Sequence, residues 1–251
     1  MENLNDYLPQ SISGKKVLVT GGTTGIGRAI VVVLASLGAD VLFLGNKGQY
    51  LNDALADANK TAKGKVFGFV ADVSQESEIE RIFKEVDDKL GTLDILINNA
   101  ATGAGNVTDG VYADWQYVLD TNLLSYLACC AGAIERMAKR QEGHIVNIGS
   151  MSAEIREATG SIYVATKAGI QAYSEALRKE VNKQGIKVTL VEPGAVDTDM
   201  QQKPTAEKLQ KVEDLEMLKA DDIAVAVLYA LSQPKRCDVV EIKVRPHLQL
   251  I

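Results

Sequence analysis

Short apolar runs alternate with stretches of helical periodicity along most of this chain. Apolar runs bounded by turn residues are typical of buried strands, and a 3.6-residue period is typical of amphipathic helices. The expected strands are residues 16–20, 40–44, 65–71, 93–97, 145–148, 187–191 and 239–244. The expected helices are residues 28–37, 49–61, 75–90, 220–232, a helix that continues after Lys167 to Val181, and a long helix from Asp114. This alternation predicts an α/β Rossmann fold, a doubly wound parallel β-sheet with helices on both faces.

The long helix from Asp114 carries a stripe of mostly apolar residues at helical spacing. These positions are predicted to face inward: Trp115, Val118, Asn122, Leu123, Leu127 and Ile134. Asn122 is then a polar side chain within an apolar stripe. It serves either a site or a structural hydrogen bond to neighbouring backbone.

The length of 251 residues fits one domain, residues 1–251. Residues 1–13 form an N-terminal extension. The stretch 200–217 is polar and follows the end of a strand, so it is interpreted either as a mobile substrate flap or as a plain surface helix.

Composition excludes several classes of function. The net charge of -6 and the pI near 5.1 argue against a nucleic-acid or anionic-membrane surface. The three cysteines form no CxxC pair and there are two histidines, so we expect a reduced compartment and no metal. No signal peptide or membrane span is apparent, and a cytoplasmic location is the default.

A glycine-rich turn joins the first strand to the first helix. Strand, glycine turn and helix together favour a dinucleotide site, in which the backbone approaches a pyrophosphate at a helix N-terminus. The alternative is a βα turn whose glycines serve geometry alone. The residues expected to bind the cofactor here are Gly21, Thr23, Thr24, Gly25, Ile26 and Gly27.

The second strand ends at Asn46 and Lys47, without the acidic residue that usually accepts from the ribose hydroxyls of NAD. Asn46, Lys47 and the hydroxyls of the glycine-rich turn could instead hold a 2′-phosphate. NADP(H) is therefore the preferred cofactor, and NAD(H) remains possible. In the alternative interpretation, Lys47 only begins a solvated loop.

Polar residues also follow the third and fourth strands. Asp72 and Val73 end one strand, and Asp72 either caps the next helix or contacts the adenine. Asn98 and Ala100 lie at the next strand end, where a cofactor edge would pass.

Tyr163 and Lys167 stand four positions apart, which places them on one helix face. A nearby ammonium stabilises a phenolate and lowers its pKa toward the range of an acid/base catalyst. Ser150 follows an apolar strand, where a hydroxyl can hold a substrate oxygen. Taken alone, the Tyr163 and Lys167 pair also fits a packed ring beside a solvated charge.

The ordered set of motifs resembles the short-chain dehydrogenases/reductases from about Lys16 to Val244. The motifs are Thr20-Gly21-xxx-Gly25-Ile26-Gly27, Asp72-Val73, Asn98-Asn99-Ala100, Asn122, Ser150, Tyr163-xxx-Lys167 and Pro193-Gly194-xxx-Thr198. The resemblance implies hydride transfer between a nicotinamide and a small carbonyl or alcohol substrate. It also implies a homo-oligomer, a tetramer or a dimer.

By this resemblance, four residues form a catalytic set. Tyr163 is the general acid or base, and Ser150 positions the carbonyl or hydroxyl. Lys167 lowers the pKa of the tyrosine and binds the nicotinamide ribose, and Asn122 holds a water for a proton relay. Further cofactor contacts are implied at Pro193, Gly194, Val196 and Thr198.

The C-terminal stretch 239–246 is similar to that of the NADP-dependent hydroxy-acid dehydrogenases and carbonyl reductases. A 3-oxoacyl-carrier-protein ketoreductase is an alternative, although the glycine-paired ending typical of that branch is absent. Arg156 either receives a substrate carboxylate or is a surface arginine paired with Glu154 or Glu157.

Two other classes of function stay open. An epimerase or dehydratase on the same frame usually has an added substrate domain that this chain lacks. A non-catalytic NADP(H)-sensing protein would not need the intact catalytic set.

Overall fold

A computed structural model describes residues 9–199 and 204–249. It contains a seven-stranded parallel sheet in the order β3-β2-β1-β4-β5-β6-β7. The strands are β1 (Lys16–Val19), β2 (Asp40–Gly45), β3 (Val66–Val70), β4 (Ile95–Asn98), β5 (Gly143–Ile148), β6 (Ile186–Pro193) and β7 (Glu241–Val244). The order runs outward in both directions from β1 and β4, which confirms the predicted doubly wound sheet.

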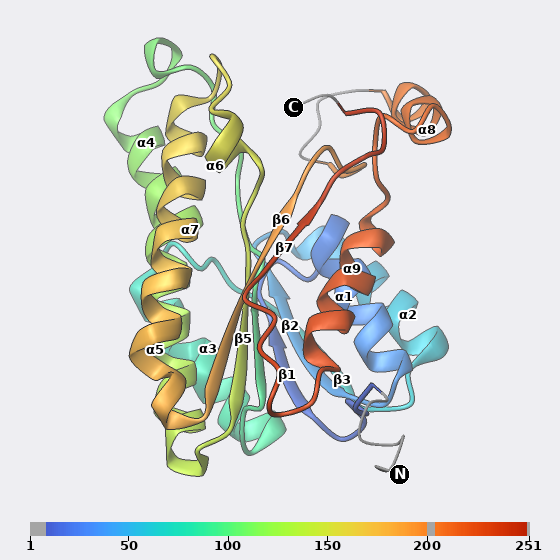
Figure 1. Ribbon diagram of the computed structural model, residues 1–251, viewed down its shortest axis with the longest axis vertical. Helices are drawn as coiled ribbons and strands as arrows, with labels where there is room; N and C mark the ends of the chain where they lie inside the picture. Colours follow the sequence, from blue (N-terminus) through green and yellow to red (C-terminus); the bar gives the residue numbers. More distant parts are fainter. Residues whose placement is uncertain (1–8, 200–203, 250–251) are drawn as a thin grey trace.

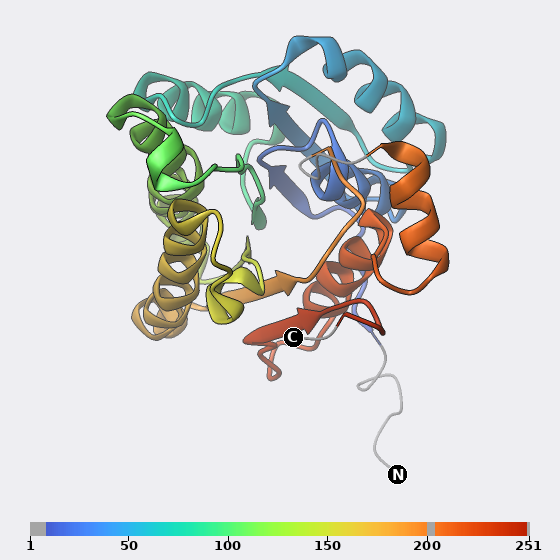
Figure 2. The same cartoon turned by 90° about the horizontal axis from the view of Figure 1, so that it is seen from above.

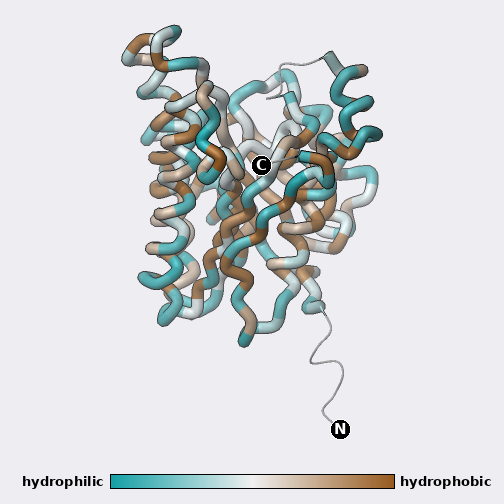
Figure 3. The backbone as a smooth tube through the Cα atoms, turned by 45° about the horizontal axis from the view of Figure 1, so that its top comes forward, coloured by the Kyte–Doolittle hydropathy of each residue, from teal (hydrophilic) through white to brown (hydrophobic). Residues whose placement is uncertain are grey.

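Successive residues of a strand point to opposite faces of the sheet, and both faces are buried. In β1, Val17 and Val19 belong to one core, whereas Leu18 belongs to the other. Burial on both faces is why central strands such as β1 are apolar without interruption, whereas the edge strand β7 alternates exposed charged and half-buried apolar residues. Figure 3 shows the hydrophobic positions concentrated along the strands and the helix faces beside them.

Helices cover both faces (Figure 1). One core packs against α1 (Gly25–Ser36), α2 (Leu51–Thr61) and α9 (Ala220–Leu231). The other packs against α3 (Glu76–Leu90), α5 (Ser125–Met137) and α7 (Ser161–Val181). The remaining α-helices of the described residues are α4 (Tyr112–Leu119), α6 (Ser152–Ile155) and α8 (Thr205–Glu213). Short 3₁₀ turns lie at Gly48–Tyr50, Val107–Asp109, Ala138–Arg140 and Asn182–Gln184.

The long helix predicted from Asp114 begins earlier and is interrupted. It runs as α4, then as a π-helical segment, η4 (Asp120–Leu124), then as α5. The extra residue of a π turn rotates the buried face, so the predicted inward stripe is partly wrong. Leu127 and Ile134 are only half-buried, and the residues that face inward on α5 are Tyr126, Cys129, Cys130, Ala133 and Met137.

By length and hydropathy alone, the stretch Tyr112–Arg140 could cross a membrane. Tyr126 and Met137 on this stretch are completely buried, and α5 packs against α3 and the sheet. Its apolar character is therefore that of a core helix.

The two segments set apart in the sequence both attach to the sheet domain. The predicted extension 1–13 is described only from residue 9, where Gln10 donates to the Ser232 carbonyl and Ile12 enters the core. Within 200–217, residues 200–203 lie outside the described residues. Of the following residues, Thr205–Glu213 form the helix α8, and the two interpretations of this stretch both stay open.

Candidate functional site

The predicted site residues gather at the carboxyl edge of the sheet. The parallel strands β1 to β6 all end at this edge, which Figure 2 views from above. Strand order reverses between β1 and β4, and in open α/β sheets ligands bind in the crevice at such a switch point. The fold therefore places the glycine-rich turn, Ser150 and the Pro193-Gly194 segment around one opening.

The glycine-rich turn has the close packing that a dinucleotide cradle requires. Gly21 has φ +65°, and a Cβ there would lie 2.8 Å from the Ala100 Cα atom. A Cβ on Gly27 would lie 2.1 Å from the Gly21 carbonyl oxygen. Among the described residues, Thr24 at the N-cap of α1 makes no side-chain capping hydrogen bond. The first amides of α1 are thus available to a phosphate, and the turn fits a dinucleotide.

Asn46 and Lys47 are exposed at the end of β2. The Asn46 amide donates to the Tyr117 hydroxyl at 3.2 Å, and that hydroxyl donates to Asp72 Oδ2 at 3.4 Å. Tyr117 therefore joins the ends of β2 and β3. The other Asp72 oxygen accepts from the Ser74 amide, and the N-cap of α3 is Gln75, so Asp72 does not cap that helix.

The side chain of Asn98 turns into the core instead of toward the edge. It donates to Asn147 Oδ1 at 2.9 Å and is 1% exposed. The Ala100 amide donates to the Thr20 hydroxyl at 3.1 Å. Val73 is buried. At these positions a cofactor would meet backbone and apolar surface, not free polar side chains.

Asn122 lies in the π-helical segment η4 and is completely buried. Its Oδ1 accepts from the Thr102 amide at 2.7 Å, and its Nδ2 donates to the Thr102 carbonyl at 2.8 Å. These two bonds are the structural hydrogen bonds to backbone that one of the two interpretations of Asn122 predicted. The side chain is thereby committed to the backbone after β4, so a water held at this position would have to use the Asn122 backbone.

Ser150, Tyr163 and Lys167 meet at the carboxyl end of β5. Ser150 follows this strand, and α7 places Tyr163 and Lys167 one turn apart. The Ser150 hydroxyl lies close enough to Tyr163 to lower the pKa of its phenol, and Lys167 Nζ lies 5.7 Å from the centre of the Tyr163 ring. Lys167 is 2% exposed and donates to the Ile148 carbonyl at 2.9 Å. Lys167 is thus a buried charge beside the half-buried Tyr163 ring and the Ser150 hydroxyl. The alternative of a packed ring beside a solvated charge does not apply.

Burial governs the protonation of both groups. It raises the pKa of Tyr163 above its ordinary value, an effect that the bond from Ser150 opposes and the charge of Glu157 reinforces. This direction is opposite to the expected lowering, because burial is the largest effect on the pKa of Tyr163. Burial also lowers the pKa of Lys167 to about 8, although the charge of Glu192 works against this shift.

The Pro193-Gly194 segment closes the opposite side of the opening. The Pro193 carbonyl accepts from the Met151 amide, which ties this segment to the loop after Ser150. Val196 is buried and pairs with Leu218. The Thr198 side chain lies against Gly25, since a Cβ on that glycine would be 3.1 Å from Thr198 Cγ2.

The comparisons with known proteins agree with this geometry. The sequence profile of the short chain dehydrogenase family matches residues 15–209. The chain belongs to the short-chain dehydrogenase family. Members of this family are oxidoreductases that use nicotinamide cofactors, and this chain is a short-chain dehydrogenase/reductase.

Individual relatives align with this short-chain dehydrogenase over almost its whole length. An uncharacterized oxidoreductase of Staphylococcus epidermidis is 35% identical over 236 residues, 94% of this chain and 98% of the relative. A short chain dehydrogenase of Burkholderia cenocepacia, solved with NADP, has a TM-score of 0.83 at 27% identity and covers 94% of this chain and 98% of its own. A metagenomic short-chain oxidoreductase, also solved with NADP, has a TM-score of 0.81 at 27% identity and covers 96% of this chain and 100% of its own.

Sequence reasoning about this short-chain dehydrogenase missed Tyr117 and Lys208. Lys208 on α8 is 7% exposed and forms an ion pair with Asp197 at 2.8 Å. Nothing in the local sequence marks either residue, because their partners lie on other elements. Arg156 is exposed and donates to the Ala153 carbonyl at the end of α6, so it is a surface residue here.

Proposed function

We propose that this short-chain dehydrogenase is an NADP(H)-dependent oxidoreductase that transfers a hydride between the nicotinamide and a small carbonyl or secondary alcohol. Tyr163 is the general acid in reduction and the general base in oxidation. The observation that carries the proposal is the place of the Ser150 hydroxyl beside Tyr163, with Lys167 buried one helical turn away. A proton donor and an oxygen-binding hydroxyl then face the same substrate atom.

The bound nicotinamide supplies or accepts the hydride at the substrate carbon. The protein holds the substrate oxygen with the Ser150 hydroxyl, and the Tyr163 hydroxyl gives its proton to that oxygen as the carbonyl becomes an alcohol. Lys167 binds the nicotinamide ribose and places its positive charge beside the phenolate that remains. Asn122 contributes to the return of a proton through a water on its backbone.

The raised pKa of Tyr163 is consistent with its role as the proton donor in carbonyl reduction. A buried phenol that keeps its proton at neutral pH is ready to donate it. The substrate class is a small carbonyl compound, and the opening between the glycine-rich turn and the Pro193-Gly194 segment receives the cofactor. We assign to Val196 and Thr198 the role of holding the carboxamide group of the nicotinamide.

NADP(H) is favoured over NAD(H) by the residues at the end of β2. Lys47 is exposed and has no acidic neighbour in the sequence up to Asp53, so its ammonium is available to a 2′-phosphate. Two relatives of known structure were solved with NADP. A homo-oligomer in the cytoplasm belongs to the same proposal, and exposed apolar side chains such as Tyr112, Val225 and Tyr229 support association.

The preference is tested by calorimetric titration of the purified protein with NADPH and NADH. Wild type is expected to bind NADPH the tighter, and Lys47→Ala should weaken NADPH binding about tenfold, the loss of one charge contact of about 1.4 kcal/mol. NADH binding should change little, because it lacks the 2′-phosphate.

Lys84→Ala is the matched control, since Lys84 is an exposed lysine on α3 and its loss changes the net charge equally. Equal or tighter binding of NADH by wild type would overturn the assignment of Asn46 and Lys47. If neither cofactor bound, the proposed function itself would fail.

A further inference from the structure

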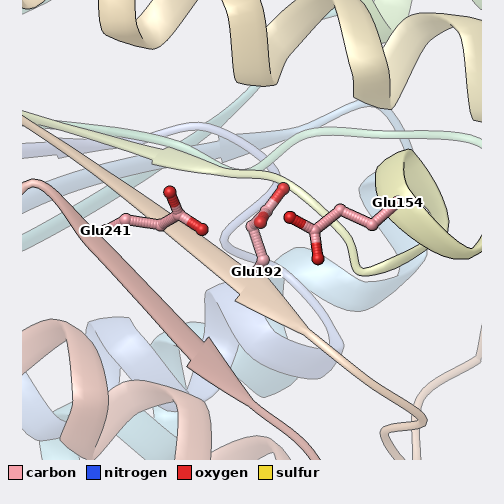
Figure 4. Close-up of side chains that lie close together, drawn as sticks. All are labelled: Glu154, Glu192 and Glu241. Carbon is pink, nitrogen blue, oxygen red and sulfur yellow. The ribbon is translucent and has the colours of Figure 1, made fainter. Parts of the chain in front are cut away.

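A second cluster of ionisable side chains lies behind the proposed catalytic loop. Glu154 comes from α6, Glu192 from the end of strand β6 and Glu241 from the start of strand β7. One carboxylate oxygen of each residue lies within 4.8 Å of the other two. Figure 4 shows the three carboxylates converging from these separate elements.

Glu192 lies at the centre of this cluster, and one of its carboxylate oxygens lacks a hydrogen-bond donor among the described residues. It is 0% exposed, and its Oε1 atom has no hydrogen-bond partner among the described residues. Its carboxylate receives a long bond, 3.5 Å, from the Gln171 amide at Oε2 and lies within hydrogen-bonding reach of the Glu241 carboxylate. A buried carboxylate oxygen without a donor is costly, and an ion or a proton relieves that cost.

The charges of the cluster do not balance. Lys243 forms ion pairs with Glu154 and with Glu241, the latter at 2.9 Å. One ammonium against three carboxylates leaves two negative charges. Burial and the charge of Glu241 raise the pKa of Glu192 to about 7, which reflects the same deficit of positive charge.

We propose that Glu154, Glu192 and Glu241 form a binding site for a hard divalent cation such as Ca²⁺, Mn²⁺ or Mg²⁺. Carboxylate oxygens are the ligands that these ions take, and Ca²⁺ binds oxygen at about 2.3–2.6 Å. Two oxygens bound to one such ion are therefore separated by at most roughly 5.2 Å, and the three carboxylate oxygens, all within 4.8 Å of one another, satisfy this limit. This proposal departs from the expectation of no metal, which rested on the scarcity of histidine and of paired cysteines, the usual ligands of zinc.

Lys243 competes for this site. Its side chain is 39% exposed, so it can leave for solvent when a divalent ion enters. With Lys243 displaced, the three carboxylates face the two positive charges of the ion. The ammonium therefore holds two of the ligands together in the absence of the ion.

The site lies directly against the segment that carries Ser150. A Cβ on Gly149 would lie 3.4 Å from Glu192 Oε1, and Glu154 belongs to the helix that follows Ser150. A bound ion would fasten α6 to β6 and β7 behind the catalytic loop. This consequence rests on the proposed function, whereas the binding site does not.

The test is a titration of the full chain with Mn²⁺, in which electron paramagnetic resonance measures the free ion. Wild type is expected to bind one Mn²⁺ per chain with a Kd on the order of 10⁻⁴ M, as weak carboxylate sites do. Glu192→Gln should weaken binding at least tenfold. Lys243→Gln should strengthen it several-fold, because the competing ammonium is gone.

Glu175→Gln is the matched control, since Glu175 is an exposed carboxylate that pairs with Arg178 and Lys179 on α7. It should leave the Kd unchanged. If Glu192→Gln failed to fold, the more exposed Glu154→Gln should still weaken binding. Circular dichroism establishes that each variant is folded.

The proposal is overturned if neither wild type nor Lys243→Gln binds Mn²⁺ up to about 10 mM, the upper range of weak oxygen sites. It is also overturned if Glu192→Gln and Glu175→Gln bind equally well, which would indicate dispersed surface binding. Because the readout is ion binding, either result leaves the proposed oxidoreductase activity untouched.

Discussion

Burial determines the pKa values of the side chains proposed to catalyse the reaction, and it matters as much as their spacing along α7. Tyr163 keeps its proton because its surroundings disfavour a phenolate, and Ser150 partly offsets this by hydrogen bonding. Lys167 is charged at neutral pH although it is buried, because its pKa of about 8 lies above neutrality, and its ammonium donates a hydrogen bond to the Ile148 carbonyl. The two groups are therefore an acid and a cation in the neutral range.

The protonation of Lys167 gives a testable pH dependence. Burial depresses the pKa of this lysine to about 8, so the ammonium is present below that pH and is lost above it. We expect kcat for carbonyl reduction to fall as the pH rises through about 8. In Lys167→Arg, whose guanidinium stays charged, any residual activity should not show this fall.

Steady-state rates of both proteins between neutral and alkaline pH measure the effect. Circular dichroism over the same range controls for unfolding. A wild-type rate that stays constant to well above pH 8 would contradict the proposed role of the Lys167 charge.

The sequence predicted the spacing of Tyr163 and Lys167, but not where their polar atoms point. Lys167 donates a hydrogen bond to the Ile148 carbonyl. The position of this carbonyl relative to Lys167 depends on how α7 packs against β5. Asn122 was placed correctly in the interior, yet its bond to Thr102 depends on a loop far from it in the sequence. Local patterns identify such residues, and tertiary packing determines their partners.

At the scale of elements, α8 is tied to the segment proposed to hold the nicotinamide. Lys208 on this helix pairs with Asp197 and also donates to the Thr198 carbonyl at 3.2 Å. The pair is largely buried, so removing one partner leaves a charge without compensation. The ion pair thus couples the position of α8 to Thr198.

Lys208→Met should loosen this connection. We expect the Kd for NADPH to rise about tenfold, equivalent to about 1.4 kcal/mol, while kcat changes less because the catalytic groups are untouched. Fluorescence titration and steady-state kinetics give the two quantities.

Lys211→Met is the matched control on the same helix. Lys211 pairs with Glu216 on the more exposed side and should not affect NADPH binding. If the Lys208 and Lys211 variants bound NADPH equally well, α8 would not be coupled to the cofactor segment.

The sequence predicted most elements to within a few residues, because apolar runs and glycines mark them directly. The π-helical interruption at Asp120–Leu124 was not predicted, since one extra residue in a turn leaves no compositional signal. The ion pair between Lys208 and Asp197, which anchors α8, was not predicted either. A buried lysine in a polar stretch looks like a surface residue until its partner is located.

At the scale of the whole molecule, the doubly wound sheet brings the ends of six strands to one edge. The alternation of strands and helices predicted this architecture, and the family comparisons agree with it. The convergence of Glu154, Glu192 and Glu241 could not be predicted in the same way. These residues come from three segments that become neighbours only because β6 and β7 pair and α6 folds back over them.

The most direct test of the account is turnover of NADPH with a panel of small aldehydes and ketones by wild type and Tyr163→Phe. We expect wild type to oxidise NADPH with at least one of them. Tyr163→Phe should bind NADPH normally but reduce that compound about 10²–10⁴-fold more slowly, the contribution typical of a general acid. A Tyr163→Phe protein as active as wild type would contradict the account, as would a wild type that binds NADPH and reduces none of the panel.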